Sequence, residues 1–355
     1  MKKMVYMMNI DWRWIKQRPH FIAEGLSKKY DVVITYPYNY DRKNLQKSAI
    51  NAKNIIPLKG KRYLNKNKLF RFINRMIISI KQKKIIEEVN PQILYVTAPW
   101  QYPSIPKKYK GKIIYDCMDD QAEFYKNKLK RKSIQIQEEK LIKKADVVIS
   151  SANNLKNKLE TKYNVDDNKI VVVRNGFNGH ILNTKEIKKK TSNYNVYYFG
   201  TISEWFNFDY LLKSLNDFPN LEYFLIGPKD TEIPKNNRIH YMGIIEHDKL
   251  YETTNEADCF IMPFKLNQLI ESVDPVKLYE YINFGKNILS VKYAEIERFN
   301  KFVHFYTNYE EFKNELYEMM SSNQIKYSQK EKEEFLKNNM WNNRVEKISE
   351  LIENC

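Results

Sequence analysis

Short apolar segments alternate with amphipathic segments along most of the 355-residue chain. Each apolar run is bounded by polar residues or glycine, which is typical of buried strands. Strands that alternate with helices predict parallel sheets with helices on both faces, and the number of strands suggests two doubly wound α/β domains. The expected strands are VYMMNI, VVITY, ILYVT, IIYDC, DVVIS and IVVVR in the first half, and VYYFG, EYFLIG, IHYMG, CFIMPF and ILSV in the second.

The predicted domain boundary follows VVVRNGFN, at the start of a polar stretch rich in lysine and asparagine. We therefore expect a first domain over residues 1–178 and a second over 179–335. Residues 336–355 are predicted to form a C-terminal helix, with Trp341 as its packing anchor.

The segment LIESVDPVKLYEYINFGKNIL carries clear signals for a helix followed by a strand. Asp274 is a good N-cap, and Pro275 suits the first helical position. Gly285 is expected to end the helix, and NILSV reads as the next buried strand.

Two charged residues of this helix, Lys277 and Glu280, fall three positions apart and so share one face. A cation near the helix start and a carboxylate one turn later suit a ligand with phosphates at one end and a diol at the other, such as a nucleotide sugar. The alternative is a surface ion pair worth a few tenths of a kcal/mol.

Charge is distributed unevenly along the chain. The net charge is +17, but residues 1–175 contain 38 Lys/Arg and 16 Asp/Glu, while the remainder is slightly acidic. Such asymmetry suggests that the first domain meets a polyanionic surface. Nucleic acid is disfavoured as a partner because no DNA- or RNA-binding motif accompanies the charge.

Residues 68–84, KLFRFINRMIISIKQKK, are predicted to form a basic amphipathic helix. It could lie on an anionic membrane, or it could pack on the domain core and leave a solvated basic edge. Both alternatives remain open on the sequence. The apolar positions at helical spacing are Leu69, Phe72, Ile73, Met76, Ile77 and Ile80.

The N-terminus and the cysteines indicate a cytoplasmic protein. Asp11 and Arg13 interrupt the first apolar run too early for a signal peptide, and no stretch approaches 18 uncharged apolar residues. The three cysteines lack metal-ligand spacing and read as ordinary thiols.

Glycine is scarce, so the positions it occupies are informative. The chain has nine, of which Gly200, Gly227 and Gly243 directly follow predicted strands of the second half. Ligands of open α/β sheets bind at the carboxyl ends of strands, where the backbone must approach closely. Tight turns alone are the alternative explanation.

Long consecutive segments of the chain resemble the GT-B glycosyltransferases, most closely the retaining family-4 (group 1) type and the bacterial enzymes that build teichuronic acid and other cell-surface polysaccharides. The resemblance implies two facing Rossmann-like domains, with the nucleotide sugar bound by the second and the acceptor by the first. It also implies that the C-terminal helix packs back toward the first domain. The matching segments are DWRWIKQRPHFIAEGLSKKYDVV, YDCMDD, ADVVISSANNLKNKL, VVVRNGFN, FGTISEWFNFDYL, FLIGP, IHYMGIIEHDKL, IMPFKLNQLIESVDPVKLYEY and WNNRVEKI.

The resemblance also assigns roles to donor-site residues. Glu280 matches the family residue that binds the ribose hydroxyls, and a carboxylate is a suitable acceptor for both. Gly200 and Thr201, expected ahead of a helix, would approach the diphosphate with free N–H groups. Further donor contacts are expected from Gly227, the backbone of Met242, Gly243 and Ile244, and Ser272, Val273, Lys277, Leu278 and Arg18.

Two departures from the family pattern concern charge. Ser272 stands where family-4 enzymes usually carry an acid, and Thr201 and Phe206 stand where an Arg and a Lys are usual. Because the leaving diphosphate needs cations, Lys277 is the best candidate, with Arg18 and Lys265 as possible helpers.

The chemistry is expected from acidic residues of the first domain. Asp116, Asp119 and Asp120 cluster after a predicted strand, and one of them could act as a general base. In a retaining mechanism the donor phosphate would take the proton, and the acids would only orient the acceptor. Helix capping is the alternative for this cluster. His20 could touch the donor or simply pack.

These observations predict a metal-independent, nucleotide-sugar-dependent hexosyltransferase, retaining in mechanism, with a UDP-sugar as the first choice of donor and a GDP-sugar as the second. The acceptor would be a lipid-linked or cell-surface glycan, and the enzyme would sit peripherally on the inner face of the cell membrane. The alternatives are a GT-B nucleotide-sugar epimerase and a non-catalytic partner subunit. A dehydrogenase is disfavoured because no G-x-G-x-x-G follows a strand.

Overall fold

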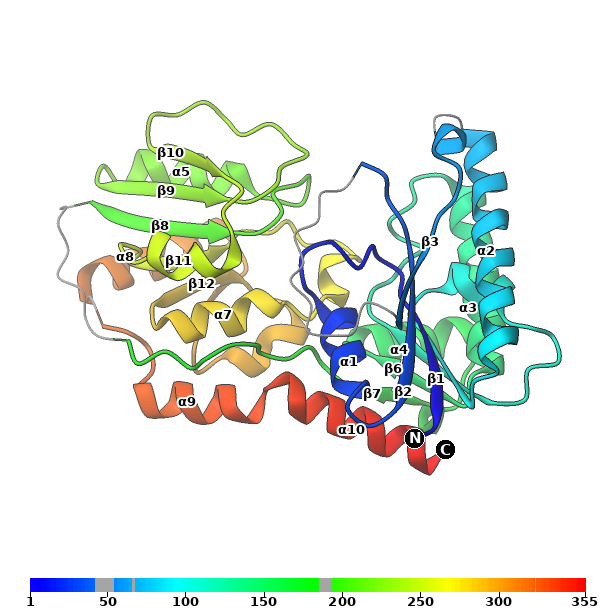
Figure 1. The fold of residues 1–355 in the computed structure, drawn as a ribbon. Helices are drawn as coiled ribbons and strands as arrows, with labels where there is room; N and C mark the ends of the chain where they lie inside the picture. Colours follow the sequence, from blue (N-terminus) through cyan, green and yellow to red (C-terminus); the bar gives the residue numbers. More distant parts are fainter. Residues whose placement is uncertain (42–53, 66–67, 185–192, 323) are drawn as a thin grey trace. The chain divides into compact units, whose positions relative to one another are not determined.

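The computed structural model describes residues 1–41, 54–65, 68–184, 193–322 and 324–355. It divides into two compact units, the first formed by Met1–Asn175 together with Trp341–Cys355 and the second by Gly176–Met340 (Figure 1). The expected boundary follows residue 178, whereas the structure divides the chain after Asn175. Residues 42–53 of the basic run and 185–192 of the expected linker lie outside the described part of the chain.

The first unit contains a seven-stranded parallel sheet in the order β3-β2-β1-β4-β5-β6-β7. This order reverses direction between β1 and β4, as in doubly wound folds, and ligands of such folds bind beside that switch point. The strands are β1 (Lys3–Met7), β2 (Asp31–Pro37), β3 (Ile55–Leu58), β4 (Ile93–Val96), β5 (Lys112–Cys117), β6 (Val147–Ser150) and β7 (Ile170–Val172).

Alternating side chains of these strands form two separate cores, one on each face of the sheet. Met4 and Tyr6 belong to one core with residues of α1 and α10, whereas Val5 and Met7 belong to the other with residues of α2, α3 and α4. This is the period of two expected of a strand that is buried on both faces. The helices are α1 (Arg18–Leu26), α2 (Lys68–Val89), α3 (Lys128–Lys144), α4 (Asn153–Tyr163) and α10 (Trp341–Asn354).

The C-terminal helix α10 belongs to the first unit, as expected. Trp341 stacks on Phe21 of α1 with ring centroids 5.0 Å apart. Val345 packs so closely on Gly25 that a Cβ there would overlap with it. Figure 1 shows α10, in red, running beside α1, in blue. Residues far apart in the sequence therefore complete one core.

The second unit contains a six-stranded parallel sheet in the order β10-β9-β8-β11-β12-β13, with its switch point between β8 and β11. Its strands are β8 (Tyr194–Phe199), β9 (Leu221–Ile226), β10 (Ile239–Gly243), β11 (Cys259–Met262), β12 (Asn287–Val291) and β13 (His304–Tyr306). Its helices are α5 (Phe208–Asp217), α6 (Leu250–Thr253), α7 (Val276–Phe284), α8 (Tyr309–Ser322) and α9 (Gln329–Asn338).

Short 3₁₀ turns connect several of these elements. They are η2 (Arg62–Asn65), η3 (Pro99–Ser104), η4 (Asp167–Lys169), η5 (His247–Lys249), η6 (Ile270–Ser272) and η7 (Ala294–Phe299).

Helix α7 differs from its prediction at the first residue. Its N-cap is Pro275 rather than Asp274, and the helix begins at Val276. The Asp274 carboxylate instead accepts a hydrogen bond from Arg298 and is almost fully buried. The predicted end is correct, because Gly285 adopts the left-handed conformation at the C-cap.

Candidate functional site

Three strands of the second unit end in glycines that bring the backbone together beside the switch point. The Gly200 N–H donates to Ile226 O at 2.8 Å, and the Gly227 N–H donates to Gly243 O at 2.7 Å. A Cβ on Gly227 would overlap with the carbonyl of Gly200. The scarce glycines therefore make close approach of backbone to backbone possible, at the sheet edge where ligands of this architecture bind.

Lys277, in the first turn of α7, lies directly against Gly200. A Cβ on Gly200 would overlap with Lys277 Cε, and Lys277 Nζ lies 5.8 Å from the centre of the Tyr198 ring. Burial lowers the pKa of Lys277, and the charge of Glu280 only partly opposes this effect. A buried ammonium gains most from an anionic partner, because the anion replaces its lost hydration.

Glu280, one turn further along α7, is hydrogen-bonded to a histidine that the sequence analysis did not single out. His247 Nε2 lies 2.6 Å from Glu280 Oε1, and the two side chains are 66% and 19% exposed. The hydrogen bond to Glu280 raises the pKa of His247, against an opposing effect of burial. The partners are 33 residues apart in sequence, so no local spacing could have revealed the pair.

The end of β10 and the loop that leads from it to η5 present apolar side chains to solvent. Tyr241, Met242 and Ile244 are all exposed, and nothing lies within 4 Å of a Cβ placed on Gly243. The Tyr241 hydroxyl donates to Gly227 O at 2.9 Å, which joins this loop to the strand ends. An exposed apolar loop with open space over a glycine can accept a flat ring.

Other expected donor contacts have structural partners within the second unit. Leu278 is fully buried in the core of that unit. The Ser272 hydroxyl donates to Gln268 O at 2.9 Å, and Val273 O accepts from the Tyr293 hydroxyl at 3.2 Å. These residues shape the turn before α7 rather than presenting free polar side chains.

The segment after β8 also differs from expectation. Thr201 is exposed, and its carbonyl accepts from the Tyr198 hydroxyl at 2.7 Å, but α5 begins only at Phe208. Gly200 and Thr201 therefore do not form a helix N-terminus. Phe206 is buried, and Lys265 is an exposed loop lysine 3.9 Å from Asp209.

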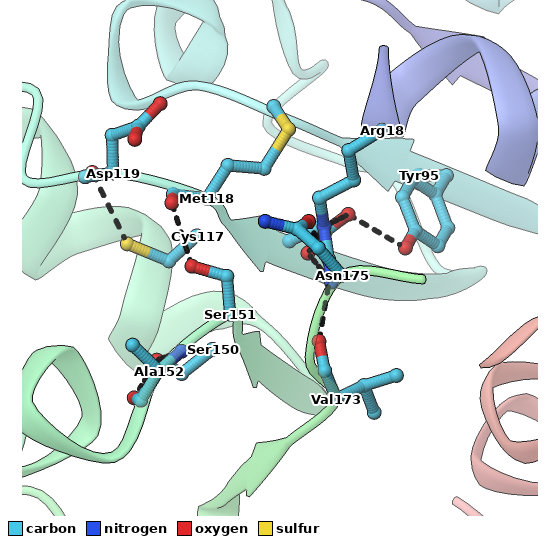
Figure 2. A network of polar contacts seen from close by, with 11 residues as sticks. Arg18, Tyr95, Cys117, Met118, Asp119, Ser150, Ser151, Ala152, Val173 and Asn175 are labelled. Atoms are coloured by element: carbon cyan, nitrogen blue, oxygen red, sulfur yellow. Dashed lines mark hydrogen bonds and ion pairs between the residues drawn. The ribbon is translucent and has the colours of Figure 1, made fainter. Parts of the chain in front are cut away.

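In the first unit, Arg18 is the centre of a buried polar network at the carboxyl end of β5 (Figure 2). Its Nη2 donates to Asp116 Oδ1 at 2.7 Å, and its Nη1 donates to Val173 O at 2.8 Å and to Asn175 Oδ1 at 3.3 Å. Asp116 also accepts from the Tyr95 hydroxyl at 3.1 Å. Arg18 and Asp116 thus neutralise each other. Their network connects α1, β4, β5 and the residues that follow β7.

Asp119 lies beside this network without entering it. In Figure 2 its carboxyl group lies apart from Arg18, and no dashed line joins the two. Burial raises the pKa of Asp119 to about 6, with Arg18 opposing the shift and the nearby Asp116 and Asp120 adding to it. The pKa of Asp119 is therefore closer to pH 7 than that of an ordinary aspartate, which suits proton exchange near pH 7.

His20 packs inside the first unit. It is fully buried, with its Nε2 2.9 Å from Trp12 O and its Nδ1 3.2 Å from the Gln17 N–H. Burial lowers its pKa to about 4, so the ring is neutral. Of the two interpretations weighed from sequence, the geometry favours packing.

Helix α2 buries Ile86 in the core of the first unit, yet three of its other apolar residues face solvent and two of its polar residues are buried. Ile73, Met76 and Ile80 are 41%, 50% and 65% exposed, while Asn74 and Gln82 are buried. The side chains of Leu69 and Phe72 lie outside the described part of the chain.

Two kinds of feature are absent from the described residues, a membrane-spanning helix and a cluster of metal ligands. No helix among them is long and apolar enough to cross a membrane. No group of three or more His, Cys, Asp or Glu residues in the same ranges is arranged to hold a metal ion.

No protein-family model matches the chain. Over 267 residues it is 21% identical to a protein named as the teichuronic acid biosynthesis glycosyltransferase TuaH of Bacillus subtilis (strain 168), with 67% of each chain covered. Sucrose-phosphate synthase from Thermosynechococcus elongatus has a TM-score of 0.77 at 9% identity, with 100% of this chain and 99% of that chain covered. Anabaena HepE, solved with UDP-glucose, has a TM-score of 0.71 at 11% identity, with both chains fully covered.

The structural likenesses establish the fold, and the sequence likeness agrees with the resemblance found in the motifs. The chain thus has the two-domain GT-B fold of these neighbours, and its sequence is similar to that of a glycosyltransferase.

Proposed function

We propose that the chain transfers a hexose from a nucleotide sugar to a polysaccharide or lipid-linked glycan. The observation that carries the proposal is the position of Lys277 against Gly200, with Glu280 one turn further along α7. The cation lies where the carboxyl ends of the parallel strands meet, and the carboxylate stands apart from it. A cation at the strand ends and a carboxylate one turn further along the helix suit a ligand that joins a diphosphate to a ribose.

The donor would lie along the second unit from the strand ends to the loop after β10. Lys277 would neutralise charge on the leaving diphosphate, which is the main catalytic demand of such a reaction. Glu280 would accept hydrogen bonds from the ribose hydroxyls, and Met242, Gly243 and Ile244 would frame the base. UDP is the first choice because HepE, a structural neighbour, was solved with UDP-glucose.

Isothermal titration calorimetry with UDP-glucose, preceded by a thermal-shift panel of nucleotides, tests the donor site. Glu280→Ala should weaken binding at least tenfold, since a charged hydrogen bond contributes about 1.5–3 kcal/mol. Lys277→Met should weaken binding similarly without lowering the melting temperature, because the substitution removes a buried charge. Glu297→Gln is a matched control, as Glu297 pairs with Lys292 on the surface of the same unit. Full donor affinity in Glu280→Ala would contradict the assignment.

For the chemical step we propose a retaining transfer in which the donor phosphate takes the acceptor proton and Asp119 orients the acceptor hydroxyl. Asp119 supports this role because its carboxylate is not used by the Arg18 network. We expect transfer to need no divalent metal, since Lys277 already supplies the compensating charge. Loss of transfer after treatment with EDTA would contradict that expectation.

An anionic membrane is the proposed location of the acceptor, and the exposed face of α2 supports it. Outward isoleucine and methionine beside basic residues suit insertion between anionic headgroups, while Ile86 of the same helix packs in the core. An exposed aromatic residue lies near this helix. Arg75 Nη2 contacts the Tyr125 hydroxyl, and the neighbouring Phe124 is exposed.

Vesicle co-sedimentation tests the membrane proposal. The triple variant Ile73→Ser, Met76→Ser, Ile80→Ser should bind phosphatidylglycerol vesicles at least tenfold more weakly than the unaltered protein, since buried apolar area and charge both contribute. Leu266→Ser, an exposed apolar residue of the second unit, is the control. Equal binding of the triple variant, or equal binding to neutral phosphatidylcholine vesicles, would refute the assignment.

The rival functions are separated by one incubation. A nucleotide-sugar epimerase would convert a UDP-sugar with no acceptor present, and a non-catalytic subunit would show no nucleotide-dependent thermal shift. Slow hydrolysis of the donor without epimer formation is the outcome expected of a transferase that lacks its acceptor.

A further inference from the structure

His247 connects two parts of the proposed donor site that are separate in sequence. It lies in η5, shortly after the exposed loop around Gly243, and its Nε2 reaches Glu280 Oε1 on α7 at 2.6 Å. The loop expected to frame the base is thereby tied to the carboxylate expected to bind the ribose.

The hydrogen bond does not use up the acceptor capacity of Glu280. A carboxylate has about four lone-pair positions, of which the imidazole takes one. Enough positions remain for two ribose hydroxyls, so His247 and a bound ribose can share the carboxylate.

The same bond bears on Lys277. Lys277 and Glu280 are three residues apart on one helix face, the spacing at which opposite charges pair. Within the described residues, the recorded ion pair of Glu280 is with His247, and Lys277 lies over Gly200 and Tyr198. If Glu280 turned toward Lys277, each would neutralise the other, and both would be lost to the ligand.

We infer that His247 is a positioning residue for the nucleotide-sugar donor, which holds Glu280 toward the ribose and away from Lys277 so that the cation stays available to the diphosphate. This inference rests on the proposed function. His247 itself need not touch the donor, and it acts through the orientation of Glu280.

The charged groups around His247 favour its protonated form. Glu280 faces it from α7 and Asp248 neighbours it in η5, and together they outweigh burial in raising its pKa. Lys249 of the same turn pairs with Glu246 at 3.2 Å, and Lys277 lies one turn before Glu280 on α7. As pH rises through the pKa of His247, its charge is lost and its hold on Glu280 weakens, although the neutral ring can still donate.

The test measures the dissociation constant of UDP-glucose by calorimetry from pH 6 to pH 8.5 (GDP-mannose replaces it if the nucleotide panel selects guanosine). The phosphates of UDP-glucose are diesters and do not titrate in this range, so a pH effect reports on the protein. His247→Ala should weaken binding about tenfold, the loss of one charge-assisted hydrogen bond. His247→Gln, which can donate but not titrate, should restore binding to within about threefold and abolish the pH dependence of the unaltered protein.

Outcomes separate this inference from the proposed function. If the unaltered protein binds no nucleotide sugar, the proposed function fails and the inference falls with it. If UDP-glucose binds and Glu280→Ala weakens it while His247→Ala does not, the function stands and the inference is refuted. Tighter binding by His247→Ala would also refute it, because His247 would then compete with the ribose.

Discussion

Asp119 and Lys277 share a property at the residue scale, since in each burial disfavours the charged form that ligand binding would use. Burial raises the pKa of Asp119 to about 6 and lowers that of Lys277. Arg18 and Asp116 show the contrasting solution, in which two buried charges are paired and hydrogen-bonded. A buried charged group that lacks a partner of opposite charge is stabilised when a ligand supplies one. Such a group therefore indicates a binding site better than a buried ion pair does.

The raised pKa of Asp119 predicts a pH-dependent cost to stability. The unfolded carboxyl titrates near 3.8 and the folded one near 6, so the folded protein holds more protons in this window and the free energy of unfolding falls as pH rises through it. Asp119→Asn should therefore be more stable than the unaltered protein at pH 7, by about 1–3 kcal/mol, with the difference vanishing below about pH 4. Urea unfolding at the two pH values measures this, and transfer activity should fall in the variant.

The Arg18–Asp116 pair predicts strong coupling between its members. Asp116→Ala should destabilise the first unit by about 3–5 kcal/mol, because it leaves a buried guanidinium without its counter-charge. The double variant Arg18→Met, Asp116→Ala should recover part of this loss. A double-mutant cycle by urea denaturation tests the coupling, and additive losses would contradict it.

At the scale of elements, all eleven strands expected from apolar runs are present, and the two strands missed within the described ranges are short edge strands. β3 (Ile55–Leu58) contains a proline and β13 (His304–Tyr306) has three residues, so neither produces a recognisable apolar run. The ends of α7 could be predicted to within a residue because caps are local signals. The orientation of α2 could not, because Ile73, Met76 and Ile80 have the spacing of a core-facing helix and yet lie outward, while Ile86 is buried in the core.

The glycines at the ends of β9 and β10 give an element-scale prediction. Gly227→Ala should destabilise the second unit more than Gly243→Ala, because both residues have positive φ but only the first would drive a Cβ into backbone. For Gly243→Ala the cost should be about 1 kcal/mol, the conformational penalty alone. Thermal unfolding ranks the two variants, and Gly243→Ala should still weaken UDP-glucose binding if the base lies over that glycine.

At the scale of the whole molecule, the proposed site depends on contacts that no local pattern records. Lys277 and Glu280 could be found because they share one helix, whereas His247 could not, because its partner lies 33 residues away. Arg18 was expected to help bind the donor diphosphate. Its guanidinium instead pairs with Asp116, which is 98 residues away in sequence. Pairing between residues far apart in sequence decides which charged side chains remain available to bind the donor. The spacing of residues along the sequence does not reveal such pairs.

The discontinuous first unit predicts the effect of a truncation. A chain that ends at Met340 would lack α10, whose Trp341, Val345 and Ile348 are buried against the first unit. Its first unit should lose protection from amide hydrogen exchange, while the second unit, which is continuous from Gly176 to Met340, should keep its protection. Equal protection of β1 and β2 in the full and truncated chains would show that α10 is dispensable.

The same discontinuity sets an order of events during synthesis. When residue 175 leaves the ribosome the first unit has its sheet but not its last helix, and the whole second unit must be translated before that helix appears. At about 5–20 residues per second this interval is roughly 10–40 s, longer than most domains need to fold. The unit made first is thus the unit completed last, and the apolar residues that pack against α10 stay uncovered during that time, when a chaperone could bind them.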